Sequence, residues 1–543
     1  MVNIQIKEDK YWREFKENKL KIWIKGYLYS HTINELIKIC TKIKYEEVSS
    51  FINSINGHFA LVVKRNDLSF IAVDKIRSTP LFFTKIDNDF YIDFNPKNLV
   101  ETDKFSKTID ENAKLELAMS GFTIGNKTIY KNLNSLIAGE LVLFSDNQYE
   151  YKHYYKYFGK LEFKSYQEFL DELLELTLNI FRKMLTQIGN RQIIIPLSAG
   201  HDSRLIASIL KYLGGKNIKC YSYGTPGNFE AKIAKKISKK LGFEWHFIPL
   251  TKKNEKKYYG SNEYREYLKF SETYSAVPFI QSLSSVKYLK DMNLINQDAI
   301  FINGLSGDFI TGGHADLKNK NKNMTGSFDI RKEIILNNLI EKHFSLWGYL
   351  KNNYNMKIIK KNLWNEITKG CGDLENENLD HLLFEYSEFI GRQSKYVVKK
   401  QKVYEFYGHE WRMPFWDDQY LKFWQKVPLK YKLNQKLYKD MLKNNNFGEV
   451  WNNDFFLNKK TISPKWVIPL RTLCKIPFGL FGMAGKKAWK QFDINFFKYF
   501  MSIPHTWDMY SYFRIVKDIF KKPRNSVSWQ AEDYLKKFKA SKS

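Results

Sequence analysis

The sequence predicts a mixed α/β and α+β protein in which a strand-rich first part is followed by a parallel sheet and a mainly helical remainder. Three observations carry this prediction. Short alternating apolar segments fill the chain from Lys21 to Tyr155, strand-like and helix-like segments then alternate between 166 and 250, and helical spacing dominates beyond Asp316. Alternating strands and helices are typical of βαβ units, which build parallel sheets.

The first part contains six segments of strand character. Their alternating, β-branched and aromatic residues suit a pleated surface, and they lie at 21–26, 59–65, 68–74, 80–85, 90–94 and 139–144. A lysine-rich aromatic stretch over 151–164 is interpreted as the connection to the next unit. We therefore expect one domain over 1–160 and a second over 165–543, the second with a helical C-terminal extension.

The second part begins with a predicted helix over 166–185 and then changes period. A continuous apolar strand over 191–198 ends in small residues, and the helix after it, over 204–215, stops at a glycine pair. The same alternation continues with strands at 218–224, 244–250 and 297–304 and a helix at 230–242. This order predicts parallel strands whose carboxyl ends meet at one edge.

The bulk composition excludes intrinsic disorder as the main state. The 543 residues are 43% hydrophobic and 16% aromatic, which is enough for packed cores. The formal net charge of +29 favours either an anionic partner or a drift of composition toward Lys, Asn, Ile and Phe. Because the lysines are spread along the chain rather than gathered in a stripe, drift is the better interpretation, and no nucleic-acid partner is predicted.

The spacing of the cysteines and the length of the apolar segments indicate in which cellular compartment the protein is expected. Cys40, Cys220, Cys371 and Cys474 form no CxxC pair, so neither a zinc site nor a disulfide framework is predicted. The charged first residues lack the apolar stretch of a signal peptide, and no uncharged apolar run approaches the ~20 residues of a membrane span. We therefore expect a cytoplasmic protein.

One late segment leaves two interpretations open. Residues 467–492 mix apolar residues, aromatics and lysines, which predicts either a packed pair of terminal helices or peripheral membrane contact.

The segment IIIPLSAGHDSRLIA (193–207) is the most informative one in the chain. A buried strand delivers small residues to the start of a helix, where exposed backbone amides and the helix dipole bind phosphate. Ser198 and Ser203 add hydroxyl donors, whereas Asp202 would repel phosphate unless Mg²⁺ lay between them. The alternative is an ordinary strand–turn–helix connection with a capping aspartate. The segment is not a GxxxxGK[ST] phosphate loop, because no lysine follows a second glycine.

Two motifs resemble those of known enzymes. LSAGHDSR (197–204) resembles the SGGxDS loop of ATP pyrophosphatases, with alanine in place of one glycine, and FINGLSGDFITGGH (301–314) resembles the asparagine synthetase segment GEGxDExxGGY. The resemblance implies an adenine-nucleotide α-hydrolase-like (HUP/PP-loop) domain. It implies that Mg²⁺ is held by Asp202 and Asp308, and that ATP and pyrophosphate are bound by Leu197, Ser198, Ala199, Gly200, His201, Asp202, Ser203, Tyr223, Gly224 and Gly304.

A third stretch, 412–442, resembles the RxPFLD…K segment of the same family. It places Lys439 where the family has a lysine on the α-phosphate, so the resemblance implies Lys439, Asp308 and Asp202 as the catalytic residues. Alone, Lys439 would be interpreted as a solvated helix lysine. Residues 459–470 resemble a later family stretch, and Glu230 and His246 match family positions that are either functional or structural.

Two departures from the family pattern concern the acyl group. Leu305 stands where the family has an acidic residue near the reacting acyl group, and Phe309 replaces a second acidic residue. The expected consequence is that the ATP chemistry is kept while the acyl pocket has changed.

The first part resembles a class II glutaminase domain over 55–85 and 128–157, which implies an Ntn-hydrolase-like α/β/β/α sandwich. That chemistry needs a cysteine at position 2, where this chain has Val2. Asn56 stands where an aspartate would hold the amino group of glutamine. We therefore predict a degenerate domain without glutaminase activity.

The predicted function is an ATP-dependent amide ligase that forms AMP and pyrophosphate and activates a carboxylate, of a sugar acid or specialised metabolite, as an acyl-adenylate. The nitrogen would come from free ammonia, a separate glutaminase or an amine on the substrate. Asparagine synthesis from aspartate and a nucleotide-binding pseudoenzyme are the alternatives. Relatives that share the change at Leu305 and the missing glutaminase also include ring-closing enzymes that form β-lactams or lasso peptides, and RNA modification is the weakest alternative.

Overall fold

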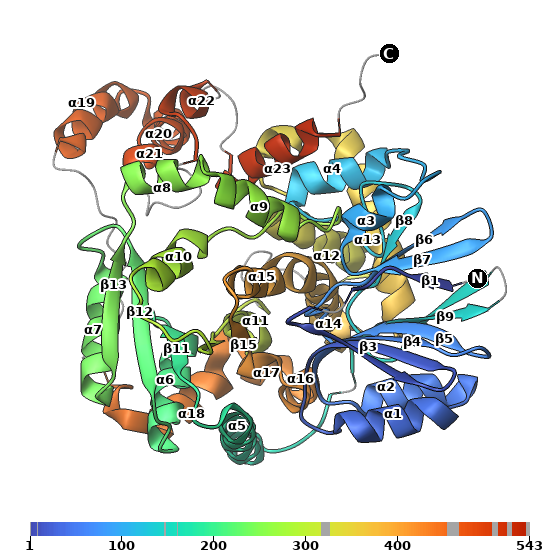
Figure 1. The fold of residues 1–543 in the computed structure, drawn as a ribbon. Coiled ribbons are helices and arrows are strands. Elements are labelled where there is room, and N and C mark those ends of the chain that lie inside the picture. The colour runs from blue at the N-terminus through green and yellow to red at the C-terminus, as the bar shows by residue number, and fades with distance from the viewer. Residues whose placement is uncertain are drawn as a thin grey trace.

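The computed structural model describes residues 2–7, 9–145, 148–159, 161–315, 326–452, 466–501, 509–517 and 524–538 (Figure 1). The strand-rich first part, blue in Figure 1, lies on one side of the molecule, and the parallel sheet, green, lies on the other. The helices of the second half pack between and above them.

Two sheets build the first part. The six-stranded sheet has the order β10 (Gln148–His153), β9 (Glu140–Ser145), β5 (Ser69–Val73), β4 (Gly57–Lys64), β3 (Leu20–Leu28) and β2 (Trp12–Glu17). The four-stranded sheet has the order β1 (Val2–Ile4), β7 (Asp89–Asp93), β6 (Phe82–Ile86) and β8 (Leu133–Ser135).

Alternation along the strands explains how these sheets stack. On β4, Ala60 and Val62 belong to the apolar cluster between the two sheets, whereas Phe59, Leu61 and Val63 pack on the opposite face. Successive strand residues point to opposite faces, so a strand that is apolar at every position is covered on both. Helices α1 (Ile33–Lys42) and α2 (Val48–Ser54) cover one outer face, and α3 (Pro96–Val100) and α4 (Glu111–Ser120) cover the other. The predicted α/β/β/α sandwich is confirmed.

The second part is built on a five-stranded parallel sheet. Its order is β13 (Glu244–Pro249), β12 (Ile218–Gly224), β11 (Ile193–Pro196), β14 (Ile300–Ile302) and β15 (Glu410–Arg412). Helices α5 (Tyr166–Ile188), α6 (His201–Tyr212) and α7 (Phe229–Leu241) accompany it. The three isoleucines of β11 are buried, as expected for the central strand of a sheet covered on both faces. The predicted parallel-sheet domain is confirmed.

Three boundaries differ from the sequence prediction. The strand predicted over 191–198 is shorter, because its last residues turn into a loop. Residues 148–153, partly assigned to the connection, form β10 paired with β9. The strand β15 lies in the part predicted to be mainly helical, where three residues pair with β14. Such short strands exist through tertiary pairing, which local patterns do not encode.

The remaining helices surround the sheet. They are α8 (Lys252–Tyr259), α9 (Asn262–Phe270), α10 (Leu283–Asp291), α11 (Gly307–Ile310), α12 (Phe328–His343), α13 (Asn353–Gly370), α14 (Asp380–Glu388), α15 (Gln401–Phe406), α16 (Asp418–Lys426), α17 (Leu429–Lys432), α18 (Lys436–Asn445), α19 (Val467–Gly479), α20 (Gly482–Phe496), α21 (Lys498–Met501), α22 (Tyr512–Val516) and α23 (Ser526–Lys536). In the part of the chain that the structure describes, no helix is both long and apolar enough to cross a bilayer.

Buried polar contacts join the sandwich to the second part. Lys75 of the sandwich pairs with Asp418 on α16, and Lys25 pairs with Glu405 on α15 at 2.7 Å. Helix α23 also returns to the sandwich, where Tyr534 joins the apolar cluster around Phe82 and Leu117 on its outer face. The two parts are therefore held together by ion pairs inside the molecule and by an apolar contact at its surface.

Candidate active site

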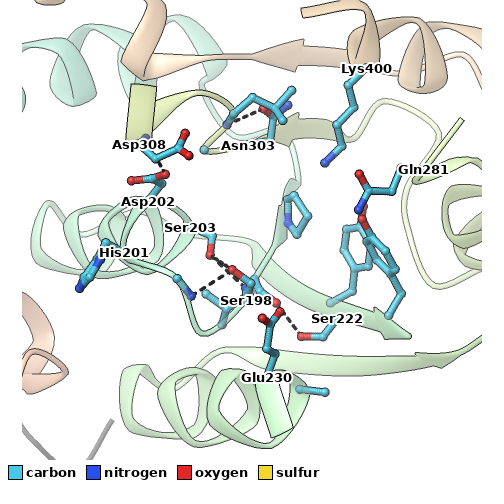
Figure 2. Close-up of a pocket in the computed structure, with 18 of the residues that line it drawn as sticks. Ser198, His201, Asp202, Ser203, Ser222, Glu230, Gln281, Asn303, Asp308 and Lys400 are labelled. Atoms are coloured by element: carbon cyan, nitrogen blue, oxygen red, sulfur yellow. Dashed lines mark hydrogen bonds between the residues drawn. The ribbon is translucent and has the colours of Figure 1, made fainter. Parts of the chain in front are cut away.

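A cavity of about 710 Å³ opens at the carboxyl ends of β11, β12 and β14 (Figure 2). Ligands of open α/β sheets bind at this edge, where the loops after the strands converge. The cavity is lined by nine of the residues predicted for the site: Leu197, Ser198, Gly200, His201, Asp202, Ser203, Tyr223, Gly304 and Asp308. Ala199, Gly224 and Lys439 are not among its lining residues.

The loop after β11 is folded around two serine hydroxyls. The Ser198 amide donates to Oγ of Ser203 at 3.0 Å, and the Gly200 amide donates to Oγ of Ser198 at 3.2 Å. Helix α6 begins after Gly200 without a side-chain cap, unlike α5 and α7, which Ser165 and Asn228 cap. Since the first amides of a helix have no intrahelical acceptor, this end of the cavity offers donors and a helix dipole to an anion.

Asp202, in the first turn of α6, and Asp308, in the short helix α11 after β14, face each other (Figure 2). The backbone amide of Asp308 donates to Oδ2 of Asp202 at 3.1 Å, and the Tyr438 hydroxyl donates to Oδ1 of Asp202 at 3.2 Å. Burial, and then the charge of Asp308, raise the pKa of Asp202 to about 7. A cation between the two carboxylates would relieve this repulsion.

Two glycines allow this close approach. A Cβ added at Gly304 would lie 2.7 Å from Cβ of Asp202, and one added at Gly307 would lie 2.4 Å from Cγ of Asp202. Both distances are shorter than van der Waals contact, so any larger residue would push the loop after β14 away from α6. The spacing of these glycines around Asp308 therefore has a steric reason.

A histidine bridges Asp308 to a buried glutamate. Nε2 of His314 lies 3.2 Å from Oδ2 of Asp308, and Nδ1 lies 2.6 Å from Oε1 of Glu388. Burial lowers the pKa of His314, but the two carboxylates outweigh it and raise the pKa to about 9. Burial raises the pKa of Asp308, yet hydrogen bonding and the charge of His314 bring it below its ordinary value. Asp308 is thus held ionised and oriented.

The donor set fits Mg²⁺ in part. The described residues contain no group of three or more His, Cys, Asp or Glu side chains arranged to hold a metal. At phosphate sites, however, Mg²⁺ commonly binds only one or two carboxylates of the protein. Phosphate oxygens and waters complete its octahedral coordination. Asp202 and Asp308 suit that arrangement because hard carboxylate oxygens face one another beside an anion-binding helix start.

Aromatic and apolar groups line another wall. The Leu197 amide donates to the carbonyl of Tyr221 at 2.8 Å, which extends the β11–β12 pairing into the loop. The rings of Tyr221 and Tyr223 stack at a centroid distance of 6.2 Å, and both residues line the cavity. Glu230 also lines it, whereas His246 pairs with Glu244 at 2.6 Å and does not.

Lys439 lies outside the cavity, half-buried on α18. Burial, and then the charges of Arg204, Lys439 and Lys443, lower the pKa of His201 to about 4, which places Lys439 near that ring. His201 itself is exposed and stacks on Trp451 with an interplanar angle of 11°. Residues 459–465 of the later stretch that resembles the family lie outside the described residues.

Several lining residues were not among the predicted site residues, and they include Gln281, Asn303, Lys400 and Gln435. The stretch between Tyr264 and Pro278 contributes no lining residue. Asn303 directly precedes the glycine motif and was within reach of the pattern. Lys400 lies in a lysine-rich helical run, where nothing in the local sequence distinguishes it.

Comparison with known families agrees with this geometry. The family model for asparagine synthase matches residues 187–445, and the model for the glutamine amidotransferase domain matches residues 39–155. Among curated proteins, none matches the sequence.

Two solved structures are similar to parts of this chain at low sequence identity. Glutamine phosphoribosylpyrophosphate amidotransferase from B. subtilis, complexed with ADP and GMP, is 9% identical over 55% of this chain and 64% of its own, with a TM-score of 0.20. An allosteric regulatory enzyme of purine biosynthesis is 9% identical over 54% of this chain and 56% of its own, with a TM-score of 0.19. The chain thus spans less than two thirds of the length of either protein.

Proposed function

Because the chain belongs to the asparagine synthetase-like family, we propose that it is a ligase that cleaves ATP to AMP and pyrophosphate while it joins a carboxylate to an amine. The carboxylate would attack the α-phosphate to give an acyl-adenylate, and the amine would then displace AMP. The observation that carries the proposal is the pair Asp202 and Asp308, facing each other beside the uncapped start of α6.

The residues of this pair and of the adjoining loop have distinct proposed tasks. Asp202 and Asp308 would hold Mg²⁺, which when bound neutralises charge on the leaving pyrophosphate. The hydroxyls of Ser198 and Ser203 and the first amides of α6 would bind the β- and γ-phosphates. Leu197 and the Tyr223–Gly224 backbone would flank the adenine. Gly304 would lie beside Asp202 at the pyrophosphate, and Ala199, Gly200 and His201 would shape the loop.

Lys439 is proposed to neutralise the α-phosphate as it is attacked. It lies on α18 directly after Tyr438, whose hydroxyl contacts Asp202. Since Lys439 does not line the cavity, its flexible side chain must swing from the side of His201 to reach the nucleotide. A Lys439→Met variant should bind Mg-ATP but lose adenylate formation, and loss of nucleotide binding instead would contradict this assignment.

The nitrogen source is proposed to lie outside the amidotransferase domain. The matched domain contains one cysteine, Cys40, which is fully buried and whose pKa burial raises to about 12. A thiol that stays protonated and covered is a poor nucleophile. Val2 has an aliphatic side chain in β1, next to Phe90. We expect no glutamine hydrolysis, and unchanged use of ammonium in a Cys40→Ser variant; glutamine-dependent turnover lost in that variant would refute the idea.

The carboxylate is proposed to belong to a sugar acid or specialised metabolite, such as a precursor of polysaccharides. Leu305 supports this, since it places an aliphatic side chain in the cavity wall where the resemblance expects an acid. Asparagine synthesis from aspartate is the alternative, and a nucleotide-binding pseudoenzyme is the next. The retained Asp202, Asp308 and Lys439 count against the pseudoenzyme.

The deciding experiment measures AMP and pyrophosphate released from Mg-ATP with ammonium and a panel of carboxylates. The panel contains aspartate and nucleotide-activated sugar acids, with Asp202→Ala as the inactive control. Release that requires one carboxylate and is lost in the control supports the ligase and names its substrate class. Clear Mg-ATP binding without release across the panel would shift the assignment to the pseudoenzyme.

Two further proposals concern organisation and location. We divide the chain into an amidotransferase-like domain over 1–160 and a synthetase domain over 165–543. We place the reaction in the cytoplasm, which is supported by four cysteines that form no disulfide.

Peripheral membrane contact through α19 and α20 is proposed as well. Their exposed apolar side chains are Trp466, Ile468, Leu470, Leu473, Ile476, Leu480, Phe481 and Met483, and the exposed lysines beside them are Lys475, Lys486, Lys487 and Lys490. Residues 466–490 contain no Asp or Glu, so the surface complements anionic lipid. Flotation with phosphatidylserine vesicles should succeed for the intact protein and fail for Leu473→Ser combined with Phe481→Ser. Equal flotation of both would end this proposal.

A further inference from the structure

Lys400 differs from every other buried lysine in the described chain. Seven lysines are buried: Lys25, Lys75, Lys395, Lys399, Lys400, Lys402 and Lys432. Glutamate or aspartate carboxylates pair with Lys25, Lys75, Lys402 and Lys432, while Lys395 and Lys399 donate to hydroxyl and carbonyl oxygens. Lys400 makes none of these contacts.

The ammonium of Lys400 is directed into the cavity. Lys400 ends the short helix η5 (Val398–Lys400), is 8% exposed, and points toward the space between Gln281 and Asn303 (Figure 2). Burial alone lowers its pKa to about 8, and no ionisable side chain contributes to that shift. A buried cation without a partner costs free energy, which an anion entering the cavity would offset.

Lys400 lies away from the end of the cavity where pyrophosphate is proposed to bind. Asp202 and Asp308 lie across the cavity, and neither contributes to the pKa of Lys400. Gln281 and Asn303 lie around the Lys400 end (Figure 2), and the Leu305 amide donates to Oδ1 of Asn303 at 3.2 Å. Because the family resemblance implies that Leu305 lies near the acyl group, Lys400 would face the acyl substrate and not the leaving phosphates.

The positive charge at this end of the cavity would disfavour a substrate that carries an ammonium group there. With Leu305 in place of an acid and Lys400 as the cation, the acyl end is positive. An ammonium such as that of aspartate would meet like charge there, whereas a second anionic group would meet an unpaired lysine flanked by two amides. Such a group keeps its charge through adenylation, so its pairing with Lys400 persists as the carboxyl reacts.

We propose that Lys400 is the specificity residue of the acyl subsite and binds a second anionic group, a carboxylate or a phosphate, on the carboxylic-acid substrate. The inference rests on the proposed ligase function. It predicts that the protein selects acids with a second negative charge over singly charged acids, and over aspartate, whose second carboxylate is accompanied by an ammonium.

The test compares the wild type with Lys400→Met, Lys400→Arg and a control, Lys290→Met, that removes an exposed lysine on α10 outside the cavity. Each protein is saturated with Mg²⁺ and a non-hydrolysable ATP analogue. Succinate and UDP-glucuronate serve as the carboxylate and phosphate probes with a second charge, and butyrate and glucuronate as singly charged controls. Binding is measured by calorimetry on these complexes, and AMP release is measured separately by a coupled assay with Mg-ATP in place of the analogue.

We expect the two multiply charged probes to bind the wild type at least 10-fold more tightly than Lys400→Met, with Lys400→Arg intermediate and Lys290→Met unchanged. Affinity in the wild type should fall as the pH rises through 8, and that dependence should vanish in Lys400→Arg. Which probe responds tells carboxylate from phosphate. The proposal would be overturned if wild type and Lys400→Met bound every probe equally tightly, or if neither protein bound any probe.

Weaker binding of the ATP analogue itself to Lys400→Met would also overturn the proposal, because it would place Lys400 on the nucleotide. Failure of the ligase function is distinguishable from both outcomes. In that case the binding difference would persist while no carboxylate releases AMP from the wild type.

Discussion

The amide of Asp308 donates to the carboxylate of Asp202 across 106 positions of sequence, at 3.1 Å. This contact joins the start of α6 to the loop after β14 and brings two carboxylates together beside unpaired helix amides. Burial first, and then the charge of Asp308, raise the pKa of Asp202, so the ionised pair costs free energy in the absence of a cation. The arrangement makes sense as a divalent-cation site, and the predictions start from it.

Removing either carboxylate should abolish the cation-dependent chemistry. We expect Asp202→Asn and Asp308→Asn each to lower AMP release by roughly 100–1,000-fold, because charge on the leaving pyrophosphate is no longer balanced. Thermal unfolding should show that Mg-ATP stabilises the wild type and neither variant. Asp291→Asn, which removes an exposed carboxylate on α10, is the control. Retained stabilisation by Mg-ATP in both variants would contradict the site.

His314 should affect the metal through Asp308. His314→Gln removes the charge that keeps Asp308 ionised and leaves Glu388 with one fewer partner. We expect the apparent Mg²⁺ affinity to fall by roughly 10–100-fold, as for other groups that orient a metal ligand. Titrating Mg²⁺ against AMP release at saturating ATP measures this. An unchanged Mg²⁺ requirement would show that the bridge is structural only.

Gly307 is expected to tolerate no side chain. An alanine there would place its Cβ 2.4 Å from Cγ of Asp202 and move the carboxylate. Displacements of about 1 Å at a reacting centre cost about 100-fold in rate, so a loss of that order is expected for Gly307→Ala. Gly372→Ala, where an added Cβ meets nothing within 4 Å, should retain full AMP release.

Removing one partner of the Lys75–Asp418 ion pair should destabilise the protein strongly, whereas replacing both partners by apolar residues should destabilise it little. Both side chains are buried at the contact between the sandwich and α16. Lys75→Met alone leaves an unpaired buried carboxylate and should lower the free energy of unfolding by about 3–5 kcal/mol. Combining it with Asp418→Leu should recover most of that loss in urea denaturation. If the double variant is as unstable as the single one, packing rather than charge dominates the contact.

Lys400 should make stability depend on pH in a defined direction. Its pKa in the folded protein is about 8, against 10.5 for an ordinary lysine. Between these values the unfolded chain binds a proton that the folded protein has released, so the free energy of unfolding rises with pH. Below pH 8 both states hold the proton, and the cost of burying the charge is complete.

Lys400→Met should therefore raise the free energy of unfolding by roughly 1–3 kcal/mol at pH 7 and by little at pH 10. Urea denaturation at both pH values, without nucleotide, measures the difference. If Lys400→Met raised the free energy of unfolding equally at both pH values, better packing of the methionine would explain the gain. Burial of the Lys400 charge would then not be what destabilises the wild type.

The site could be predicted best where residues of a defined chemistry also stand at a defined spacing in the sequence. The strand ending at Pro196, the small residues after it and Asp202 formed a recognisable pattern, and nine predicted residues line the cavity. Local periodicity also placed β12 and α7 to within one residue.

What depended on tertiary context could not be predicted. Lys400 resembles its neighbours Lys399 and Lys402 in sequence, and only packing decides that those two find partners while Lys400 does not. The strand β15 exists because β14 offers it an edge. Lys439 was placed by resemblance alone, and the side chain lies outside the cavity, so its role stays a prediction.

Helix α23 has a consequence for synthesis on the ribosome. The outer face of the four-stranded sheet, with Phe82, is covered by Leu117 of α4 and by Tyr534 and Ala531 of α23. These residues are translated more than 400 positions after Phe82, so the face remains incompletely covered while the whole second part emerges. Since domains begin to fold from the N-terminus during translation, the nascent sandwich presents an apolar surface until α23 arrives.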